Sequence, residues 1–342
     1  MKTKKLSEIS DIQYGYAFDS HYFTNDNKYP QLVRIRDIKR GFSETYYLGK
    51  YDEDYVVHYG DLLIGMDGNF NISRWKSEDA LLNQRVCKIA AKQDIIYEEY
   101  LQYALSRRLK HIEEKTAFVT VKHLSAKTLS NLKLEVPSQV EQIKIAQIIS
   151  KISKAINTKK DELRKLDELI KARFVEMFGD PISNNKSLSL KEFREICDLK
   201  AGDFTPAKQI FKVQDPINQY PCYGGNGIRG FVSNYTHDGK YVLIGRQGAL
   251  CGNVKLASGK FKNTEHAILV NPKIPINVFW LFELLDLEKL NRFKSGAAQP
   301  GLAVKTLNKI LIPNVDLECQ NEFANFVQQV DKSKVAVQKS LE

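Results

Sequence analysis

The strongest constraint on the fold is an internal repeat with a spacing of about 180 residues. Four separate anchors recur at almost the same offset: LLIGMDG (62–68) with VLIGRQG (242–248), Asn83 with Asn263, YLQYAL (100–105) with WLFELL (280–285), and the pair KTL (127–129) with KTL (305–307) and Gln142 with Gln320. Repeats at a fixed spacing are typical of duplicated structural units. The sequence therefore predicts a tandem duplication in which each unit places a globular part before a helix.

The helix of the first unit is a long segment, residues 142–177, without glycine or proline. Its apolar residues recur at the spacing of a coiled coil. They fall on two adjoining seams: Ile149, Ile156, Leu163, Ile170 and Met177 on one, and Ile145, Ile152 and Leu166 on the other, which Lys159 and Arg173 interrupt. At about 1.5 Å per residue such a helix is roughly 50–60 Å long. We expect it to separate two bodies, and a long surface helix on a single domain is the plainer alternative.

The second unit ends in a shorter helical segment, residues 320–342. Its seam consists of Phe323, Val327, Val330, Val337 and Leu341, and Lys334 breaks it. These residues can pair with the first helix over about three heptads. The predicted helix-pairing residues are therefore those of this seam together with the isoleucines and leucines of the first helix.

Length and composition fit a soluble protein with two cores. The chain has 342 residues, 43% of them hydrophobic and 27% charged, and we find no apolar run of the ~18–20 residues that a membrane span needs. The start, MKTKKLSEIS, has no apolar signal core, so we expect a cytoplasmic protein. The five cysteines are scattered without Cys-x-x-Cys spacing, which favours reduced thiols over zinc or disulfides. The six histidines show no metal-ligand spacing.

The charge is uneven along the chain. The net charge is +10, and residues 181–313 carry most of the excess, with 18 Lys and Arg against 10 Asp and Glu. Such a surplus favours a polyanionic partner, although many basic proteins bind no nucleic acid.

Polar side chains in the first unit gather around two predicted strands. The alternation in LVRIRDI (32–38) predicts a strand with two arginines on one face. A second strand, residues 61–65, leads into a glycine turn and an exposed polar run, and Asn and Arg are side chains that match base edges. A solvated hairpin is the alternative for each residue taken singly. The candidate DNA-binding residues are Arg34, Arg36, Asn69, Asn71, Arg74, Lys76, Asn83, Gln84 and Arg85.

The second unit keeps the frame but changes its polar residues. Arg246 and Gln247 replace Met66 and Asp67, and TEH (264–266) replaces QRV (84–86). The same frame with different side chains indicates two modules that read different sequences. The candidates here are Asn226, Arg229, Arg246, Gln247, Asn253, Lys260, Lys262, Asn263, His266 and, in the turn-forming loop SGAAQPG, Gln299.

The sequence gives little support for a catalytic or cofactor-binding motif. GNGIRG (225–230) spells a dinucleotide-binding glycine pattern, but strand and turn formers follow it where the motif needs a helix. We interpret it as a turn. There is no Walker loop, and the isolated prolines exclude the Asn/Asp-Pro-Pro-aromatic motif of amino-methyltransferases. Glu113, Glu114 and Lys115 imitate a nuclease set, but a solvated helix end is the more economical interpretation.

The order of these motifs resembles a known family. LVRIRDI, GDLLIGMDGNFN, Trp75, LLNQRVCKI, a helix, and a second helix that runs from QIKIAQII into TKKDELRKLDELIKARFVEMFGD resemble the DNA-specificity subunits of type I restriction-modification systems over essentially the whole chain. The resemblance implies an α+β fold with two target-recognition domains separated by long helices that form an antiparallel coiled coil. The implied divisions are target-recognition domain 1 (1–137), a central helical spacer (138–180), target-recognition domain 2 (181–313) and a short C-terminal helical region (314–342).

The same resemblance implies a subunit without catalytic activity that reads a bipartite, asymmetric site in double-stranded DNA. It implies two methyltransferase subunits as partners that modify adenine, and it leaves restriction subunits open. S-adenosylmethionine, ATP and magnesium are then expected in partner subunits and no cofactor in this chain, with the spacer between half-sites set by the helix length. The short second helix, from a natural or an artificial shortening, leaves docking of the second methyltransferase open, and the uncovered stretch near Ile170 and Phe174 could pair with another copy or with a methyltransferase.

Two other classes of function remain. A stand-alone adenine methyltransferase with degenerate motifs would bind S-adenosylmethionine by itself. A helical scaffold that touches no DNA would tolerate replacement of Arg34, Arg36, Arg229 and Arg246.

Overall fold

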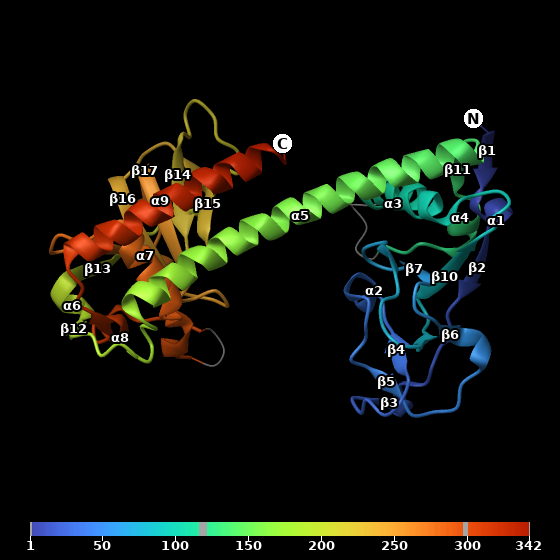
Figure 1. Cartoon of the computed structure of the whole chain (residues 1–342), viewed down its shortest axis with the longest axis horizontal. Coiled ribbons are helices and arrows are strands. Elements are labelled where there is room, and N and C mark those ends of the chain that lie inside the picture. Colours follow the sequence, from blue (N-terminus) through green and yellow to red (C-terminus); the bar gives the residue numbers. More distant parts are fainter. Residues whose placement is uncertain (1, 116–121, 297–299, 342) are drawn as a thin grey trace. The chain divides into compact units, whose positions relative to one another are not determined.

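The computed structural model describes residues 2–115, 122–296 and 300–341. Contacts divide the chain into two units, Met1–Ala155 and Ile156–Glu342. Helix α5 (Gln139–Phe178) gives its first part to unit 1 and its second part to unit 2 (Figure 1). The predicted α+β tandem with a long helix is confirmed, and the finer four-part division stays a prediction.

Unit 1 consists of short strands and helices followed by the start of α5. Its elements are β1 (Lys2–Lys5), α1 (Leu6–Ile9), β2 (Ser10–Tyr14), η1 (Ser20–Tyr22), β3 (Phe23–Thr24), β4 (Gln31–Val33), α2 (Asp37–Arg40), β5 (Tyr46–Tyr47), η2 (Glu53–Tyr55), β6 (Val56–Val57), β7 (Leu62–Gly65), β8 (Ile72–Arg74), β9 (Ala80–Leu82), β10 (Val86–Ala91), α3 (Glu98–Lys115), α4 (Ala126–Ser130) and β11 (Lys133–Val136).

The sheets of unit 1 place two cores on the two sides of β7 and β10. One sheet has the order β2-β10-β7-β8 and another the order β3-β5-β4-β9-β6, while β1 pairs with β11. Because strand side chains alternate, Ile64 of β7 packs with Leu101 and Leu105 of α3, whereas its neighbour Leu63 packs with Trp75 on the other side. Burial on both faces explains the uninterrupted apolar run of β7.

Unit 2 contains longer strands, with α9 as its last helix. Its elements after α5 are β12 (Leu190–Glu192), α6 (Phe193–Ile196), β13 (Cys197–Ala201), η3 (Ala207–Gln209), β14 (Tyr220–Gly224), β15 (Gly227–Val232), β16 (His237–Gly245), β17 (Val254–Asn263), β18 (Ala267–Pro272), α7 (Val278–Leu287), η4 (Leu290–Phe293), α8 (Val304–Leu307), β19 (Leu311–Pro313) and α9 (Leu317–Lys339).

The sheet of unit 2 has the order β13-β18-β16-β17-β14-β15, and all of its pairs are antiparallel except β14 with β17. Unit 1 has the same exception, since β4 and β9 pair in parallel. The core of unit 2 joins β16 and β18 to α7 and to the aromatic side chains Phe174, Trp280 and Phe323. The internal repeat is thus a repeat of topology as well as of sequence.

The repeated glutamines explain one anchor of the sequence pattern. Gln142 is 1% exposed, its Oε1 accepts from the Tyr97 amide at 2.7 Å, and its Nε2 donates to the carbonyls of Ile95 and Pro137. Gln320, which is 4% exposed, does the same with the Asn277 amide and the Val315 carbonyl. Each glutamine therefore joins the first turn of a long helix to the residues just before an earlier helix, α3 for Gln142 and α7 for Gln320.

Helices α5 and α9 pack antiparallel within unit 2. Arg173 contacts Glu322 at 3.0 Å, while Asp167, earlier in α5, contacts Lys334, later in α9, at 2.7 Å. Between these pairs the predicted seam residues Ile170, Phe323, Val327 and Val330 are buried in one cluster, with Leu166 packed against it. Figure 1 shows α9 beside the second part of α5, and Val337 is also buried.

The structure corrects two expectations about helices and strands. Ile152 and Ile156 are 54% and 38% exposed, so among the described residues α9 does not cover them, and the other seam positions of this stretch, Ile145, Ile149 and Leu163, are half-buried. The expected strand through residues 32–38 ends at Val33.

The strand ends early because of the Asp37 carboxylate. This side chain accepts a hydrogen bond from the Arg34 amide at 3.0 Å, and the Asp37 amide donates to the Arg34 carbonyl at 2.8 Å. These bonds close a turn, since a side-chain acceptor of this kind competes with strand pairing. Arg34 and Arg36 therefore lie in a turn before α2 and do not share the face of a strand.

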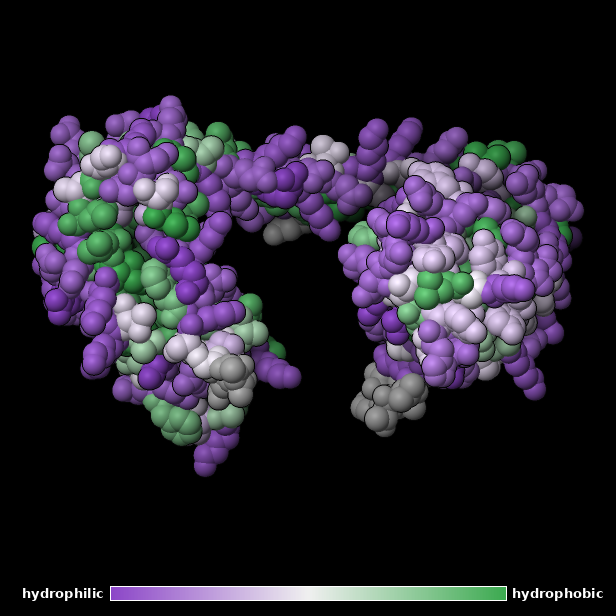
Figure 2. All heavy atoms as spheres, turned by 90° about the horizontal axis from the view of Figure 1, so that it is seen from below, coloured by the Kyte–Doolittle hydropathy of each residue, from purple (hydrophilic) through white to green (hydrophobic). Residues whose placement is uncertain are grey.

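No helix among the described residues has the length and apolar character needed to cross a membrane. The face in Figure 2 is largely hydrophilic, with hydrophobic residues in separate patches.

Candidate nucleic-acid interface

Three turns of unit 1 meet at one end of its sheet, and we name them turn cluster 1 (residues 66–71, 83–86 and 122–124). The Met66 amide donates to the Arg85 carbonyl at 2.8 Å, and the Leu124 amide donates to the Met66 carbonyl at 2.7 Å. The Gly68 amide binds the Lys122 carbonyl at 2.9 Å. Segments far apart in the sequence are thus held together by backbone hydrogen bonds.

Three polar side chains form a network in turn cluster 1. Asp67 receives the Arg85 guanidinium at 3.1 Å and the His123 ring at 2.5 Å. The side chains of Arg85 and His123 are 55% and 47% exposed, whereas that of Asp67 is 22% exposed. The carboxylate is therefore recessed beneath two exposed nitrogen-bearing groups.

Arg85 has an unusual backbone conformation for its residue type. Its φ is 70°, in the left-handed region that favours glycine. The turn is closed by the Val86 amide, which donates to the Asn83 carbonyl, and the Gln84 amide donates to the Asn83 side chain. The surrounding bonds thus impose this conformation on the arginine.

Four segments of unit 2 meet in the same way, and we name them turn cluster 2 (residues 224–227, 246–253, 264–266 and 300–302). The Arg246 amide donates to the His266 carbonyl, and the Leu302 amide to the Arg246 carbonyl, both at 2.8 Å. A Cβ on Gly245 would lie 2.2 Å from the Gly225 carbonyl oxygen, so only glycine permits this approach. The glycine pattern of residues 225–230 covers the turn between β14 and β15 and the first part of β15, and no helix follows it.

The side chains of turn cluster 2 are mostly uncharged. His266 contacts the Gln247 amide oxygen at 2.9 Å and Glu265 at 3.2 Å, and Asn253 donates to Asn226 at 2.8 Å. Arg246 forms no ion pair among the residues that the structure describes. The cluster therefore combines amide and imidazole groups with an available guanidinium.

The structure shifts the repeat by one residue in this region. Met66 bonds to Arg85 and Arg246 bonds to His266, so Arg85 corresponds to His266, whereas the constant offset pairs Val86 with His266. The turn after Asn263 is one residue longer than the turn after Asn83. Equivalent positions thus carry the pairs Asp67–Arg85 and Gln247–His266.

The remaining predicted residues divide into those at the clusters and those elsewhere. Asn69, Asn71 and Gln84 lie in turn cluster 1, and Arg34 and Arg36 border it through Ile35, whose Cγ2 would lie 3.1 Å from a Cβ on Gly65. Arg229 follows the first turn of cluster 2 on β15 and is exposed. Asn83 and Asn263 are buried supports, with Asn263 Nδ2 donating to the Ala267 carbonyl at 2.9 Å.

Other candidates are engaged or lie away from the turns. Arg74 contacts Glu98 at 2.5 Å and the Gly60 carbonyl at 2.9 Å, which fits a role inside the unit. The Lys76 side chain packs against Gly41, and the Lys260 amine lies 4.9 Å from the centre of the Tyr235 ring. Lys262 lies on β17 opposite Cys222. Gln299 falls outside the described residues.

Three residues at the clusters escaped the sequence prediction: Asp67, His123 and Glu265. His123 reaches Asp67 only because the tertiary fold brings residues 122–124 to the turn after β7, and no local pattern signals that approach. Glu265 is placed by the longer turn of unit 2. A signal did exist for Asp67, because the repeat aligned it with Gln247, which was itself a candidate.

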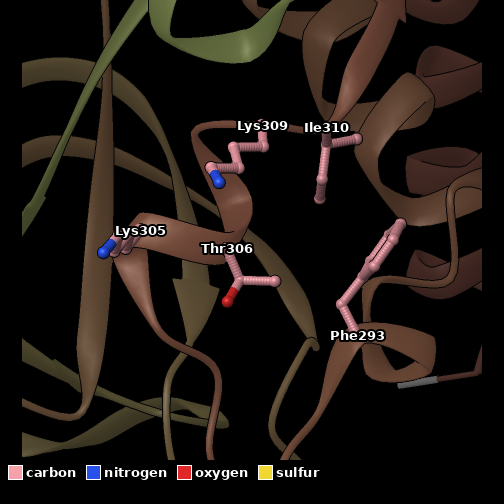
Figure 3. Close-up of a pocket in the computed structure, with 5 residues that line it drawn as sticks. All are labelled: Phe293, Lys305, Thr306, Lys309 and Ile310. Atoms are coloured by element: carbon pink, nitrogen blue, oxygen red, sulfur yellow. The ribbon is translucent and has the colours of Figure 1, made fainter.

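Other sites offer no catalytic arrangement. Within the described ranges no group of three His, Cys, Asp or Glu side chains is placed to hold a metal ion. A cavity of about 360 Å³ lies between η4 and α8, where Phe293 and Ile310 face each other and Lys305, Thr306 and Lys309 form the rest of the lining (Figure 3). No acid or nucleophile–base pair lines it. Glu113, at the end of α3, accepts from the Phe70 amide at 3.3 Å and so supports turn cluster 1.

Comparison with known proteins identifies the family. A model of the type I restriction modification DNA specificity domain matches residues 1–168 and again residues 185–342. The chain belongs to this DNA specificity family. The two matches correspond to the two repeats found in the sequence, so each unit with its long helix is one copy of the family's domain.

Similar relatives include two from Escherichia coli. The EcoBI specificity subunit is 39% identical over 166 residues, which cover 48% of this chain and 35% of the relative. The EcoprrI specificity subunit is 45% identical over 128 residues, 37% of this chain and 32% of the relative. The chain thus spans about a third of the length of these two curated relatives. A crystal structure of the Mycoplasma genitalium type I S subunit matches 99% of this chain and 91% of its own, with a TM-score of 0.61 at 17% identity, and shares the fold.

Proposed function

We propose that this member of the specificity family is a non-catalytic subunit that reads a bipartite, asymmetric site in double-stranded DNA. The observation that carries the proposal is the pair of turn clusters, in which one scaffold presents Asp67 and Arg85 in unit 1 but Gln247 and His266 in unit 2. Two copies with the same hydrogen-bonding groups at these places would suit two identical half-sites. Different hydrogen-bonding groups at equivalent places suit two different half-sites.

The side-chain chemistry of the clusters suits the major groove. Arginine matches the two acceptors of guanine, and asparagine and glutamine match the donor and acceptor of adenine. Lysines and arginines around the turns, including the bordering Arg34 and Arg36 and the exposed Arg229, would supply phosphate contacts that fix orientation without reading sequence. Base choice and salt-dependent affinity thus rest on different residues.

The proposal places catalysis in partner subunits. Two adenine methyltransferase subunits would dock on the helical regions and bring S-adenosylmethionine, and restriction subunits, where the system has them, would bring ATP and magnesium. Within the described residues α9 covers only the second part of α5, so the exposed middle stretch, residues 150–158, is available to such partners. The system would act in the cytoplasm.

The test is the methylation pattern of cellular DNA. We expect long-read sequencing of DNA from cells that contain this chain and a methyltransferase subunit of its system to show methylated adenine in one split motif. Cells with the methyltransferase subunit alone are the control and should lack that motif. A motif that is identical with and without this chain would contradict the proposal, as would binding of S-adenosylmethionine by the purified chain alone.

A further inference from the structure

The backbone at Arg85 is fixed before any partner binds. Its carbonyl accepts from the Met66 amide at 2.8 Å, and the next amide, of Val86, donates back to the Asn83 carbonyl at 3.2 Å. With φ at 70° the turn has the conformation that glycine adopts most easily. The arginine side chain thus starts from a defined position at the tip of turn cluster 1.

The guanidinium is held on one side only. One terminal nitrogen, Nη1, contacts the Asp67 carboxylate at 3.1 Å and lies 3.4 Å from His123 Nδ1. The other terminal nitrogen and Nε have no hydrogen-bond partner among the residues that the structure describes. A planar guanidinium fixed through one nitrogen keeps its other N–H groups aligned, which is the geometry for two parallel bonds to one acceptor pair.

Stability does not explain an arginine here. An ion pair with an exposed, solvated guanidinium contributes little, and a non-glycine residue in the left-handed region carries strain. Glycine would remove the strain, and most surface residues would serve as well in its place. Strain of this kind collects at functional sites, so the observed outlier points to a task for the guanidinium.

The equivalent position in unit 2 offers different chemistry. His266 is hydrogen-bonded to the Gln247 side chain at 2.9 Å, and its backbone is absent from the residues with positive φ. An imidazole cannot present two parallel donors to one base. A guanidinium at this position of the turn is therefore specific to unit 1.

We propose that Arg85 reads a guanine in the half-site bound by unit 1, donating to its O6 and N7, and that Asp67 is the positioning residue for the guanidinium. The inference deepens the proposed function and rests on it. Bidentate arginine–guanine contact is the commonest specific pairing in the major groove, and its loss weakens discrimination by about 5- to 150-fold.

The test compares the native chain with Arg85→Gly, each assembled with its methyltransferase subunit. Glycine suits the backbone of this turn, so the variant removes the guanidinium without disturbing the fold. We expect the methylation motif of the variant to accept any base at one guanine position of one half-site, with the other half-site unchanged. In binding assays, 7-deazaguanine at that position, which lacks N7 but keeps O6, should weaken the native complex by less than the roughly 5- to 150-fold of the full pair and leave Arg85→Gly unaffected.

Two further variants separate positioning from reading. Asp67→Asn should relax the same position more weakly than Arg85→Gly, while His266→Ala, the matched change in unit 2, should leave that position intact. A merely structural role for Asp67 would lower binding to all sequences equally and would not alter the motif.

The outcomes are distinct. A native chain that produces no split motif overturns both the proposed function and this inference. A native split motif that Arg85→Gly leaves unchanged overturns the inference alone. If Arg85→Gly weakens binding equally on all sequences and lowers the salt dependence by about one ion, the residue contacts phosphate and does not read a base.

Discussion

At the scale of single residues, Arg85 is an exposed residue whose backbone conformation opposes stability. Its ion pair with Asp67 involves an exposed guanidinium and contributes about 0.2–1 kcal/mol, whereas a non-glycine residue at φ of 70° costs about 1–3 kcal/mol. The balance favours glycine at this position. A residue that opposes stability and lies on the surface is a sharper guide to function than a buried one.

Arg85→Gly should accordingly leave the free energy of unfolding unchanged or raise it by about 1 kcal/mol. Relief of backbone strain outweighs the lost ion pair, and the greater freedom of glycine in the unfolded chain offsets part of the gain. Thermal or urea unfolding of the purified chain measures the effect. Gln84→Gly, in the same turn but outside the left-handed region, is the control and should be neutral or destabilising. A clear loss of stability in Arg85→Gly would show that the guanidinium holds the turn together.

The site could be predicted at this scale only in part. Alignment of the repeats brought Arg85, Gln247 and His266 forward as candidates, because they lie in turns fixed by the strands on either side. The network of Asp67 with His123 could not be predicted, since it depends on residues 122–124 returning to the turn after β7. Arg74 had the same sequence signal as Arg85 but contacts Glu98 and the Gly60 carbonyl, and only the fold distinguishes the two.

At the scale of elements, the buried glutamines anchor the long helices. Gln142 satisfies one amide and two carbonyls that are otherwise shielded from water. Leaving buried polar groups without partners costs about 1–3 kcal/mol. The side chain thus fixes both the start of α5 and the direction in which it leaves the unit.

Gln142→Ala should lower the free energy of unfolding by about 2–3 kcal/mol, because the Tyr97 amide and the Ile95 and Pro137 carbonyls lose their partner. Gln139→Ala, an exposed glutamine in the first turn of the same helix, is the matched control and should change stability by less than about 0.5 kcal/mol. Urea denaturation followed by circular dichroism measures both. Equal effects of the two variants would contradict the anchoring role.

A buried carboxyl group makes the packing of α7 in unit 2 sensitive to pH. Glu283 is 5% exposed, and its Oε1 has no hydrogen-bond partner among the described residues. Burial raises the pKa of Glu283 to about 7, against an opposing effect of Lys171. Lys171 binds Asp286 at 2.8 Å and Lys334 binds Asp167 at 2.7 Å, so neither lysine is committed to Glu283.

The raised pKa predicts the direction of the pH effect. Between the ordinary value of 4.5 and the folded value of about 7, the folded state holds a proton that the unfolded chain releases. Stability is therefore lost as the pH rises through this window, by on the order of 2–3 kcal/mol for this group. Glu283→Gln should melt at a higher temperature than the native chain at pH 8 and differ little from it at pH 5. The exposed Glu318→Gln is the control, and a native-like pH profile for Glu283→Gln would refute the assignment.

Sequence patterns predicted the long elements well and the short ones less well. The heptad pattern of residues 142–177 lies inside α5. Such a pattern is a strong signal because the same kind of apolar contact repeats many times along a long helix. The strand expected over residues 32–38 failed because one carboxylate, Asp37, captured the Arg34 amide. The exposure of Ile152 and Ile156 could not be predicted either, because the heptad pattern of one helix does not show how far the partner helix extends.

At the scale of the whole molecule, α5 belongs to both units, and residues 150–158 between their cores are exposed on every face. The stretch can change in length without disturbing the packing of either unit. If the two units read two half-sites, its length controls which spacing between half-sites is accepted.

An insertion of seven residues after Ser153 tests this. Two turns of helix add about 10.5 Å, which corresponds to about three base pairs at 3.4 Å each. We expect the methylated motif to keep both half-sites and to gain about three unspecified base pairs between them. Seven residues inserted in the loop after Asn184, outside the helix, are the control and should leave the spacing unchanged. An unaltered motif in the helix variant would show that helix length does not set the spacing between half-sites.

The glutamine anchors have one more consequence, which concerns angle. Gln142 fixes unit 1 to the first turn of α5, and the cluster around Phe174 fixes unit 2 to its last turns. A change in the length of the helix between these two anchors therefore also changes the angle between its ends. Each added residue turns one end by about 100° relative to the other. If the two units read two half-sites, a single insertion would rotate one unit about the axis of α5 relative to the other, at almost no change in length. Under that condition, the insertions that change the spacing between half-sites and keep the register of both units are near-whole turns of helix.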